Sequence, residues 1–379
     1  MSSTQFLVVG AGLAGASTAW RLAERGYSVT LIERDVPASE HGSSHGSARI
    51  FRFPYPQRAY VDLVQQSVPG WAELSALHGS DLITRCGALD FGATRDPHRL
   101  AGVLAAAGVD HELVPQAEAV QRWPHIAFDT DVLFHAAGGV LDAESIVRTM
   151  VAAAQAMGAE LLTGWPLQRL ERTSSGFTAH ATDGRTVAAE RVVVSAGGWL
   201  PDLLGNLALP SGFLDAFPAL EVREENAFHF PYRDADASSA GKWPTLIHKR
   251  ADISVYALPG GRDAQFRGQK VAEYNAGRRL PSAAAQQGAI EPANRARVVE
   301  YVRRFLPGLE PEPYAETTCL FTNTPTEDFV IDEADGVTVV SPCSGHGAKF
   351  APLLGEIAAD VALGIGSVPE RFRVGAARV

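Results

Sequence analysis

Ten residues near the end of the chain, SPCSGHGAKF at 341–350, place a thiol, an imidazole and an amine among two glycines. A buried-strand pattern, GVTVV, precedes them, and an apolar helical pattern, APLLGEIAADVALG, follows. A cation in the first turn of a helix is unfavourable because that end of the helix is positive, so Lys349 indicates a nearby anion. The stretch is therefore either a polar strand-to-helix turn or part of the wall of a binding site.

A second stretch whose residues could bind a ligand begins the chain. The strand pattern FLVV leads into Gly10, Gly12 and Gly15, with the spacing G-x-G-x-x-G, and an apolar helical pattern follows until Gly26. YSVTLIE then predicts a second strand that ends in Glu33. Such glycines let the backbone approach a pyrophosphate at the helix N-terminus, and the acid accepts the ribose hydroxyls. The unit predicts a bound adenine dinucleotide, without separating FAD from NAD.

Two further stretches could contact the same ligand. Residues 42–55, GSSHGSARIFRFPY, interleave small residues with His45, Arg49 and Arg52, which suits either a loop against a ligand or a solvated basic loop. Residues 191–201, RVVVSAGGWLP, run from a buried strand into a glycine turn, after a predicted β-hairpin. This strand end either brings backbone to the dinucleotide a second time or is only a tight turn of the sheet.

Composition restricts the class of protein. A chain of 379 residues exceeds the usual size of one core, so about two domains are expected. A net charge of −10 without a basic block argues against nucleic acid or an anionic membrane as a partner. The sequence shows no apolar run of membrane-spanning length and no signal-peptide pattern, and its three cysteines are scattered. We expect a cytoplasmic protein without a metal site.

Together these stretches resemble the monomeric sarcosine oxidase family, which includes N-methyltryptophan oxidase, among the D-amino-acid-oxidase-like flavoproteins. The resemblance covers nearly the whole chain. Its most specific parts are TTCLFTNTPTEDFVID at 317–332 and CSGHGAKF at 343–350. The family implies FAD as the cofactor, a small amino acid and O2 as reaction partners, and a monomer.

The implied fold is α/β. A Rossmann-like domain would bind FAD, and a second α+β domain with a mostly antiparallel sheet would cover the flavin and hold the substrate. Alternating patterns such as ISVYAL support strands in the second domain, and residues 283–307 predict a loop with an outer amphipathic helix. The FAD-binding domain would comprise residues 1–80, 142–214 and 320–379, and the substrate domain residues 81–141 and 215–319.

The family attaches its FAD through a cysteine that precedes a T-P-x-x-x-F-x-I-D pattern, which here implies Cys319. Cys343 is the alternative, because it lies closer to the glycine loop, and either thiol could instead be a buried core residue. The residues expected to contact the cofactor are Gly10, Gly12, Leu13, Ala14, Gly15, Glu33, Arg34, Ser43, Ser44, His45, Arg49, Ala196, Gly197, Trp199, Cys319, Gly345, His346, Gly347 and Lys349.

The resemblance also implies how the substrate is held. Arg52 and Lys349 would clamp its carboxylate, because a guanidinium fork gives orientation and an ammonium gives charge. Tyr256 would form an aromatic wall of the pocket. Tyr274 stands where sarcosine oxidase has a histidine, which changes the size and hydrogen bonding of the pocket and leaves the substrate open. The segment 228–243 could add a pocket wall or a flap.

Four residues are implied in catalysis: Lys270, Arg49, His45 and Tyr256. Lys270 matches the lysine that activates O2 in the family, and Arg267 is the competing cation by spacing. The predicted reaction is FAD-dependent oxidation of a secondary amino acid, N-methyl or cyclic, to the imine, with O2 reduced to H2O2. The alternative is a primary amino acid oxidase, or an amino acid dehydrogenase of the same fold that uses another electron acceptor.

Overall fold

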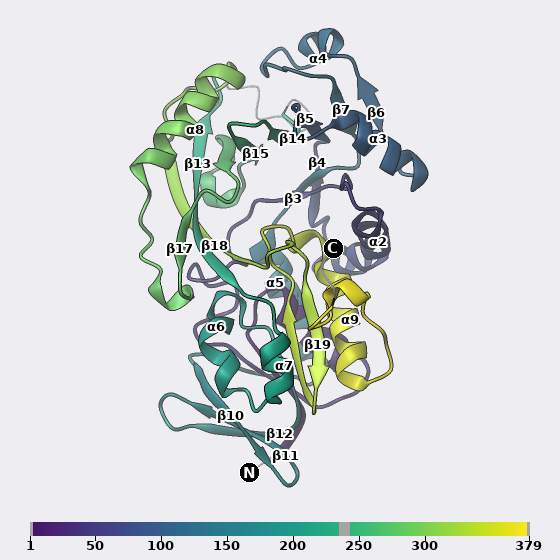
Figure 1. Cartoon of the computed structure of the whole chain (residues 1–379), viewed down its shortest axis with the longest axis vertical. Coiled ribbons are helices and arrows are strands. Elements are labelled where there is room, and N and C mark those ends of the chain that lie inside the picture. Colours follow the sequence, from purple (N-terminus) through teal and green to yellow (C-terminus); the bar gives the residue numbers. More distant parts are fainter. Residues whose placement is uncertain (1–2, 235–242, 377–379) are drawn as a thin grey trace.

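The computed structural model describes residues 3–234 and 243–376 of the chain (Figure 1). Its strands form an eight-stranded sheet, a nine-stranded sheet and a small three-stranded sheet. Figure 1 shows the two large sheets at opposite ends of an elongated molecule, each assembled from segments that are far apart in the sequence. Five further helices of the described chain are α2 (Arg58–His78), α3 (Pro97–Ala106), α4 (Gln116–Arg122), α6 (Leu200–Leu203) and α7 (Ser211–Ala216).

The eight-stranded sheet has a parallel centre. Strand β1 pairs in parallel with β12 and β2, and β12 pairs in parallel with β20. Helix α1 (Leu13–Glu24) packs on both α5 (Ala143–Ala156) and α9 (Ala351–Leu363) beside this sheet. Its strands are β1 (Ser3–Val9), β2 (Val29–Ile32), β9 (Glu160–Leu162), β10 (Leu167–Thr173), β11 (Gly176–Ala181), β12 (Thr186–Val194), β19 (Val330–Ala334) and β20 (Val337–Ser341).

The first strand, helix and second strand form as the sequence predicts. Strand β1 is apolar and buried because it is covered on both faces, as central strands of parallel sheets are. Helix α1 buries Ala16, Ala19, Trp20 and Ala23, which share one apolar side. The helix ends before Gly26, whose φ of +84° turns the chain back toward β2. The hairpin between β11 and β12 is also confirmed.

The nine-stranded sheet is antiparallel except for the pairing of β14 with β5. The predicted outer helix is α8 (Pro292–Phe305), which contacts β13 and buries Val298 and Val302. The strands are β5 (Ala88–Phe91), β6 (Glu112–Val114), β7 (Val132–His135), β13 (Glu221–Pro231), β14 (Thr245–Lys249), β15 (Ser254–Pro259), β16 (Gly268–Glu273), β17 (Arg278–Leu280) and β18 (Ala315–Asn323).

The small sheet consists of β3 (Arg49–Phe51), β8 (Gly139–Leu141) and β4 (Ile83–Arg85). The predicted fold class is confirmed: a Rossmann-like unit is combined with a second, mostly antiparallel sheet. The exact domain boundaries stay a prediction, and β18 crosses the expected boundary at 319/320. Over residues 3–234 and 243–376, no helix has both the length and the apolar character needed to span a membrane.

Candidate active site

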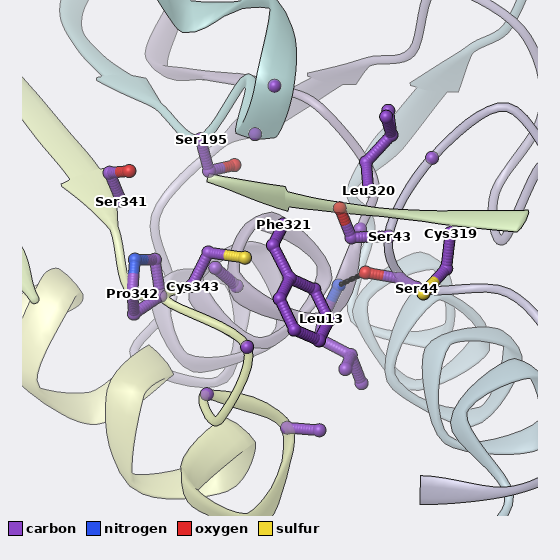
Figure 2. Close-up of a pocket in the computed structure, with 18 of the residues that line it drawn as sticks. Leu13, Ser43, Ser44, Ser195, Cys319, Leu320, Phe321, Ser341, Pro342 and Cys343 are labelled. Carbon is purple, nitrogen blue, oxygen red and sulfur yellow. Dashed lines mark hydrogen bonds between the residues drawn. The ribbon is translucent and has the colours of Figure 1, made fainter. Parts of the chain in front are cut away.

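A cavity of about 850 Å³ is lined by residues from both large sheets, a size typical of ligand and cofactor sites. Its walls include the carboxyl ends of β1 and β12, the N-terminus of α1, and residues of β14, β15, β16 and β18. Figure 2 shows the part of the wall that β18 and the loop after β20 form. Dinucleotides bind outside the carboxyl ends of parallel strands, so the cavity lies where the fold favours such a ligand.

The turn between β1 and α1 leaves no room for side chains. Gly10 adopts a φ of +92°, and a Cβ on Gly15 would lie 1.8 Å from the carbonyl oxygen of Gly10. Gly12 precedes α1 and provides no side-chain cap, so amides at the positive helix end face the cavity. One of them, the Leu13 amide, donates to Ser44 Oγ at 3.0 Å. A pyrophosphate binds where the backbone can approach closely at the N-terminus of a helix.

The acid that follows β2 lies beside the same turn. Glu33 Oε2 accepts a hydrogen bond from the Ala11 amide at 2.7 Å. Burial raises the pKa of Glu33, and the backbone amides that it accepts from oppose this effect. Arg34 lies 4.6 Å from the ring centroid of Trp199, which follows β12. Since Glu33, Arg34 and Trp199 all line the cavity, these residues fit the adenosine half of a dinucleotide.

Arg49 and Lys270 bring two cations to another part of the wall. Arg49 donates to the carbonyl oxygens of Ala48 at 2.9 Å and Ser43 at 3.0 Å, which fixes the guanidinium. Lys270 is 4% exposed, and burial together with the repulsion of Arg49 lowers its pKa to about 8. Among the described residues its amine has no hydrogen bond or ion pair. The charge of Lys270 is therefore free to act on a ligand in the cavity.

Two thiols line the cavity from different segments. Burial raises the pKa of Cys319 in β18, whereas Lys270 and Arg49 lower it. Burial also raises the pKa of Cys343, whose sulfur accepts a backbone hydrogen bond at 3.3 Å. In the view of Figure 2 the two side chains lie on either side of Phe321. Burial outweighs these effects, so the pKa of both thiols lies above its usual value.

Tyr55 lies between a half-buried cation, Arg52, and a buried one, Lys349. Lys349 Nζ donates to the Tyr55 hydroxyl at 2.9 Å and to the His346 carbonyl oxygen at 2.6 Å, and the Arg52 guanidinium lies 4.7 Å from the Tyr55 ring centroid. The Tyr55 hydroxyl bonds to His346 Nδ1 at 3.1 Å, and His346 Nε2 donates to the Glu327 carbonyl oxygen at 3.0 Å. Burial holds the pKa of Lys349 well below its usual value, and Arg52 lowers it further. Neither cation has a carboxylate partner within the described part of the chain.

One face of the nine-stranded sheet forms another wall. Lys270 lies opposite Leu258 and Ala272 lies opposite Tyr256, on the antiparallel strands β16 and β15. Because alternate residues of a strand share a face, Lys270, Ala272 and Tyr274 follow one another along the same side. Lys270, Tyr256 and Tyr274 line the cavity. The sheet therefore presents a cation, an aromatic wall and a phenol in sequence.

The Tyr274 hydroxyl is 3.0 Å from the Ser344 carbonyl oxygen and 3.1 Å from Glu327 Oε1. Burial, followed by the charge of Glu327, raises the pKa of Tyr274 far above its usual value. The phenol is therefore a neutral donor that ties the sheet to the loop before α9.

Known proteins resemble this chain in sequence and in fold. A family model described as FAD dependent oxidoreductase matches residues 5–361. The chain belongs to the FAD dependent oxidoreductase family. The predicted family resemblance and the prediction of an FAD-dependent oxidoreductase are confirmed.

The oxidoreductase is 30% identical over 364 residues to the N-methyl-L-tryptophan oxidase of Yersinia pestis (strain Pestoides F), with 93% of each chain covered. NikD, an unusual amino acid oxidase essential for nikkomycin biosynthesis, superposes with a TM-score of 0.86 at 24% identity, over 100% of this chain and 99% of its own. The L-proline dehydrogenase of P. horikoshii superposes with a TM-score of 0.82 at 18% identity, over 99% and 97% of the two chains. The two structural matches show a shared fold.

Most residues predicted from the sequence lie in the cavity wall of the oxidoreductase. They are Gly10, Gly12, Leu13, Ala14, Glu33, Arg34, Ser43, Ser44, Arg49, Arg52, Ala196, Gly197, Trp199, Tyr256, Lys270, Tyr274, Cys319, Gly345, His346, Gly347 and Lys349. Gly15 lies behind the wall, against Gly10 and Ser195. His45 also lies outside the wall: its Nε2 is buried without a hydrogen bond in the described structure, and burial lowers its pKa to about 3. The individual roles of these residues stay predictions.

Two open questions from the sequence gain a geometric answer. Arg267 is exposed, and its guanidinium lies 4.8 Å from the Tyr314 ring instead of lining the cavity, so the geometry favours Lys270. In the segment 228–243, Phe228 and Phe230 pack in the core of the nine-stranded sheet and do not line the cavity. Residues 235–242 of that segment lie outside the described residues.

Sequence reasoning missed several wall residues of the oxidoreductase. Tyr55 is buried and links Arg52 to Lys349, although the only signal in the sequence is its place at the end of the basic stretch 42–55. Lys249 also lines the cavity, at the end of β14. Its signal is the rarity of lysine in this chain, which has four among 33 Lys and Arg residues.

Proposed function

We propose that this oxidoreductase oxidises a secondary amino acid, N-methyl or cyclic, to the imine, and that O2 is reduced to H2O2. The observation that carries the proposal is a pair of cations, half-buried Arg52 and buried Lys349, which meet at Tyr55 without a carboxylate of the described chain to neutralise them. Two like charges held this close in a cavity favour an anionic ligand. The relative at 30% identity is by name an oxidase of an N-methyl amino acid, which supports a secondary amine.

The chain's own residues would bind and orient this substrate. The Arg52 guanidinium provides a planar fork for the carboxylate, and Lys349 adds a second charge. Hydrogen bonds to Tyr55 and His346 hold the Lys349 amine in position. Tyr256 gives an apolar surface for the rest of the molecule. Bound FAD supplies the acceptor for the two electrons of the C–N oxidation. Fixing the carboxylate restricts the reacting carbon to a few orientations, which is the main contribution of such a clamp to rate.

Lys270 supports O2 over another electron acceptor. Its amine is buried, lines the cavity and has no partner in the described structure. Reduction of O2 begins with a one-electron step that creates a negative charge, and a fixed cation stabilises that charge. The released imine reacts with water in solution, so hydrolysis requires no further side chain.

The test is a panel of N-methyl, cyclic and primary amino acids with peroxide detection. We expect secondary amino acids to give peroxide with the highest kcat/KM. The Arg52→Met variant should lose about 100-fold in kcat/KM for these substrates, because the substrate carboxylate loses its guanidinium partner. The corresponding amines without a carboxylate should change less than threefold. The exposed Arg58→Gln variant is the matched control.

Three outcomes would contradict the proposal in different ways. If Arg52→Met lowers kcat/KM equally for amino acids and for simple amines, Arg52 does not bind the substrate carboxylate. A higher kcat/KM for primary amino acids would identify a primary amino acid oxidase. Substrate oxidation that proceeds with a quinone but without peroxide would identify a dehydrogenase.

We also propose that FAD is attached through Cys319. Formation of a C–S bond to the 8α-methyl carbon replaces one of its C–H bonds, and the two electrons and two protons removed pass to O2. The nearby cations Lys270 and Arg49 favour the thiolate that this reaction needs. Acid precipitation of the purified protein should give a yellow pellet, and so should the Cys343→Ser variant. A yellow supernatant over a white Cys319→Ser pellet completes the expected result, whereas a white wild-type pellet would show that the flavin is not attached.

A further inference from the structure

Lysine use in this chain is unusual. Four of its 33 Lys and Arg residues are lysines, and Lys242 lies outside the described residues. The other three, Lys249, Lys270 and Lys349, all line the cavity. Among the described residues, every exposed side chain of the Lys and Arg type is an arginine, so a lysine marks the site. Lys270 and Lys349 have proposed roles, but nothing above explains Lys249.

The sheet geometry aims Lys249 into the cavity. Lys249 ends β14 and lies opposite Ser254 of β15, whereas Ile247 lies opposite Tyr256. Alternate residues share a face, so Ile247 and Lys249 lie on the same side as Tyr256, and all of these residues line the cavity. The Tyr274 amide donates to the Ser254 carbonyl oxygen at 2.8 Å, which continues the row across to β16.

The row formed by Lys249, Ser254 and Tyr274 lies at the opposite end of this sheet face from Lys270, the proposed site of O2 activation. Lys270 and Tyr274 are four residues apart along one direction of chain, about 13 Å in an extended strand. Lys249 Nζ lies 5.2 Å from the Tyr274 ring centroid. Tyr256, which lies opposite Ala272, is between Lys270 and this row. A substrate against Tyr256 therefore has Lys270 at one side and Lys249 at the other.

The charge of Lys249 is not balanced by the described protein. Its amine has neither a hydrogen bond nor an ion pair with any described residue. Its basic neighbour Arg95 is different, because Asp90 pairs with that guanidinium at 2.5 Å. The next residue, Arg250, points elsewhere and forms ion pairs with Asp129 and Asp252. Arg95 and Arg250 are thus paired with carboxylates, whereas Lys249, like Arg52, has no such partner among the described residues.

Burial and the charges of Arg95 and Arg52 lower the pKa of Lys249, while Glu327 and Asp90 raise it. Glu327 Oε1 is already bonded to Tyr274 and to Asn275. A half-buried ammonium among other cations is costly unless an anion accompanies it. One substrate carboxylate shared by Arg52 and Lys349 leaves this third charge unmatched.

We infer that Lys249 binds a second acidic group of the substrate, and that the substrate class is a secondary amino acid that carries a second carboxylate. The inference rests on the proposed function and narrows it. Lys249 acts in specificity: Arg52 and Lys349 hold the carboxylate next to the amine, and Lys249 holds the one on the side chain.

Binding of ligands without an amine tests Lys249 apart from any turnover. The purified holoenzyme is titrated with glutarate and with pentanoate, which have the same carbon count, and the flavin absorbance is followed. We expect glutarate to bind at least tenfold more tightly in the wild type. Lys249→Met should abolish this preference, Lys249→Arg should keep it, and Arg250→Gln, which removes an adjacent cation outside the cavity, should also keep it.

Equal affinities of the wild type for glutarate and pentanoate would overturn the inference, whether or not any variant folds. Equal weakening of both ligands in Lys249→Met would also overturn it, because Lys249 would then belong to the clamp for the first carboxylate.

Turnover provides the second test. The ratio of kcat/KM for N-methyl-L-glutamate to that for N-methyl-L-norvaline should exceed ten in the wild type and fall at least tenfold in Lys249→Met. If both amines are oxidised with a ratio near one, the proposed function stands and the inference fails. If neither amine yields a reduced flavin while the glutarate preference depends on Lys249, the inference about the second acid site stands and the proposed function fails.

Discussion

The two ends of the cavity are built differently. At the dinucleotide end, the wall is formed mainly by backbone. Gly10, Gly12 and Gly15 lie within six consecutive positions, and Glu33 follows after one helix and one strand. At the substrate end the contacts come from side chains on separate elements, with Arg52 after β3, Lys249 on β14 and Lys349 before α9. The first end is a local structure that requires the absence of side chains. The second is a concentration of positive charge, buried or half-buried, that requires the whole fold.

The largest expected effect breaks the dinucleotide end. Gly15→Ala places a Cβ 1.8 Å from the Gly10 carbonyl oxygen, so α1 must move away from the strand end. Overpacking of this kind costs about 1–3 kcal/mol or more and displaces the helix amides. We expect flavin content below one tenth of the wild type, measured by the ratio of flavin to protein absorbance, and a lower Tm.

Gly102→Ala is the matched control for that substitution. Gly102 is exposed in α3, and a Cβ there meets no atom within 4 Å. Helix propensity predicts that this variant gains about 0.5–1 kcal/mol of stability and keeps its flavin. Full flavin content in Gly15→Ala would show that the glycine turn does not limit binding.

The next largest effect should distinguish Lys270, the proposed oxygen-activating cation, from the cations that bind the substrate. Lys270→Met should slow the reaction of the reduced enzyme with O2 by about 100- to 1,000-fold, the usual cost of removing one fixed electrostatic group. Anaerobic reduction by the substrate should change less than tenfold. Stopped-flow absorbance measures both half-reactions. Exposed Arg267→Met should leave both within threefold, and a slow O2 reaction in this control instead would make Arg267 the oxygen-activating cation.

A smaller effect should appear in the pH dependence. The pKa of Lys270 is lowered to about 8, first by burial and then by Arg49. Lysine is charged below its pKa, so the rate of the O2 reaction should be high below this value and fall as the pH rises through it. Lys270→Arg should keep its charge and move the fall to higher pH, and Lys270→Met should give a flat profile. A wild-type rate that increases above pH 8 would contradict this role.

Much of the fold was predictable because its signals are local. Strand β1, the glycine turn, α1 and β2 follow one another, and each is specified by periodicity and by residues with special backbone freedom. The hairpin before β12 and the helix after the last glycine loop were found in the same way. Domain boundaries, the monomeric state and a cytoplasmic location are less local properties, and they stay predictions.

The candidate site divides along the same line. The sequence by itself determined the dinucleotide end, because glycines and one acid at fixed spacing produce that geometry wherever the strand, helix and strand form. It also provided Arg52, Lys270 and Lys349 as candidates, through a family resemblance. Only the tertiary structure decided that Tyr55 joins Arg52 to Lys349 and that Lys249 faces the same cavity. The reason is physical: repulsion between buried cations and the lack of carboxylate partners arise only when separate strands and loops are packed together.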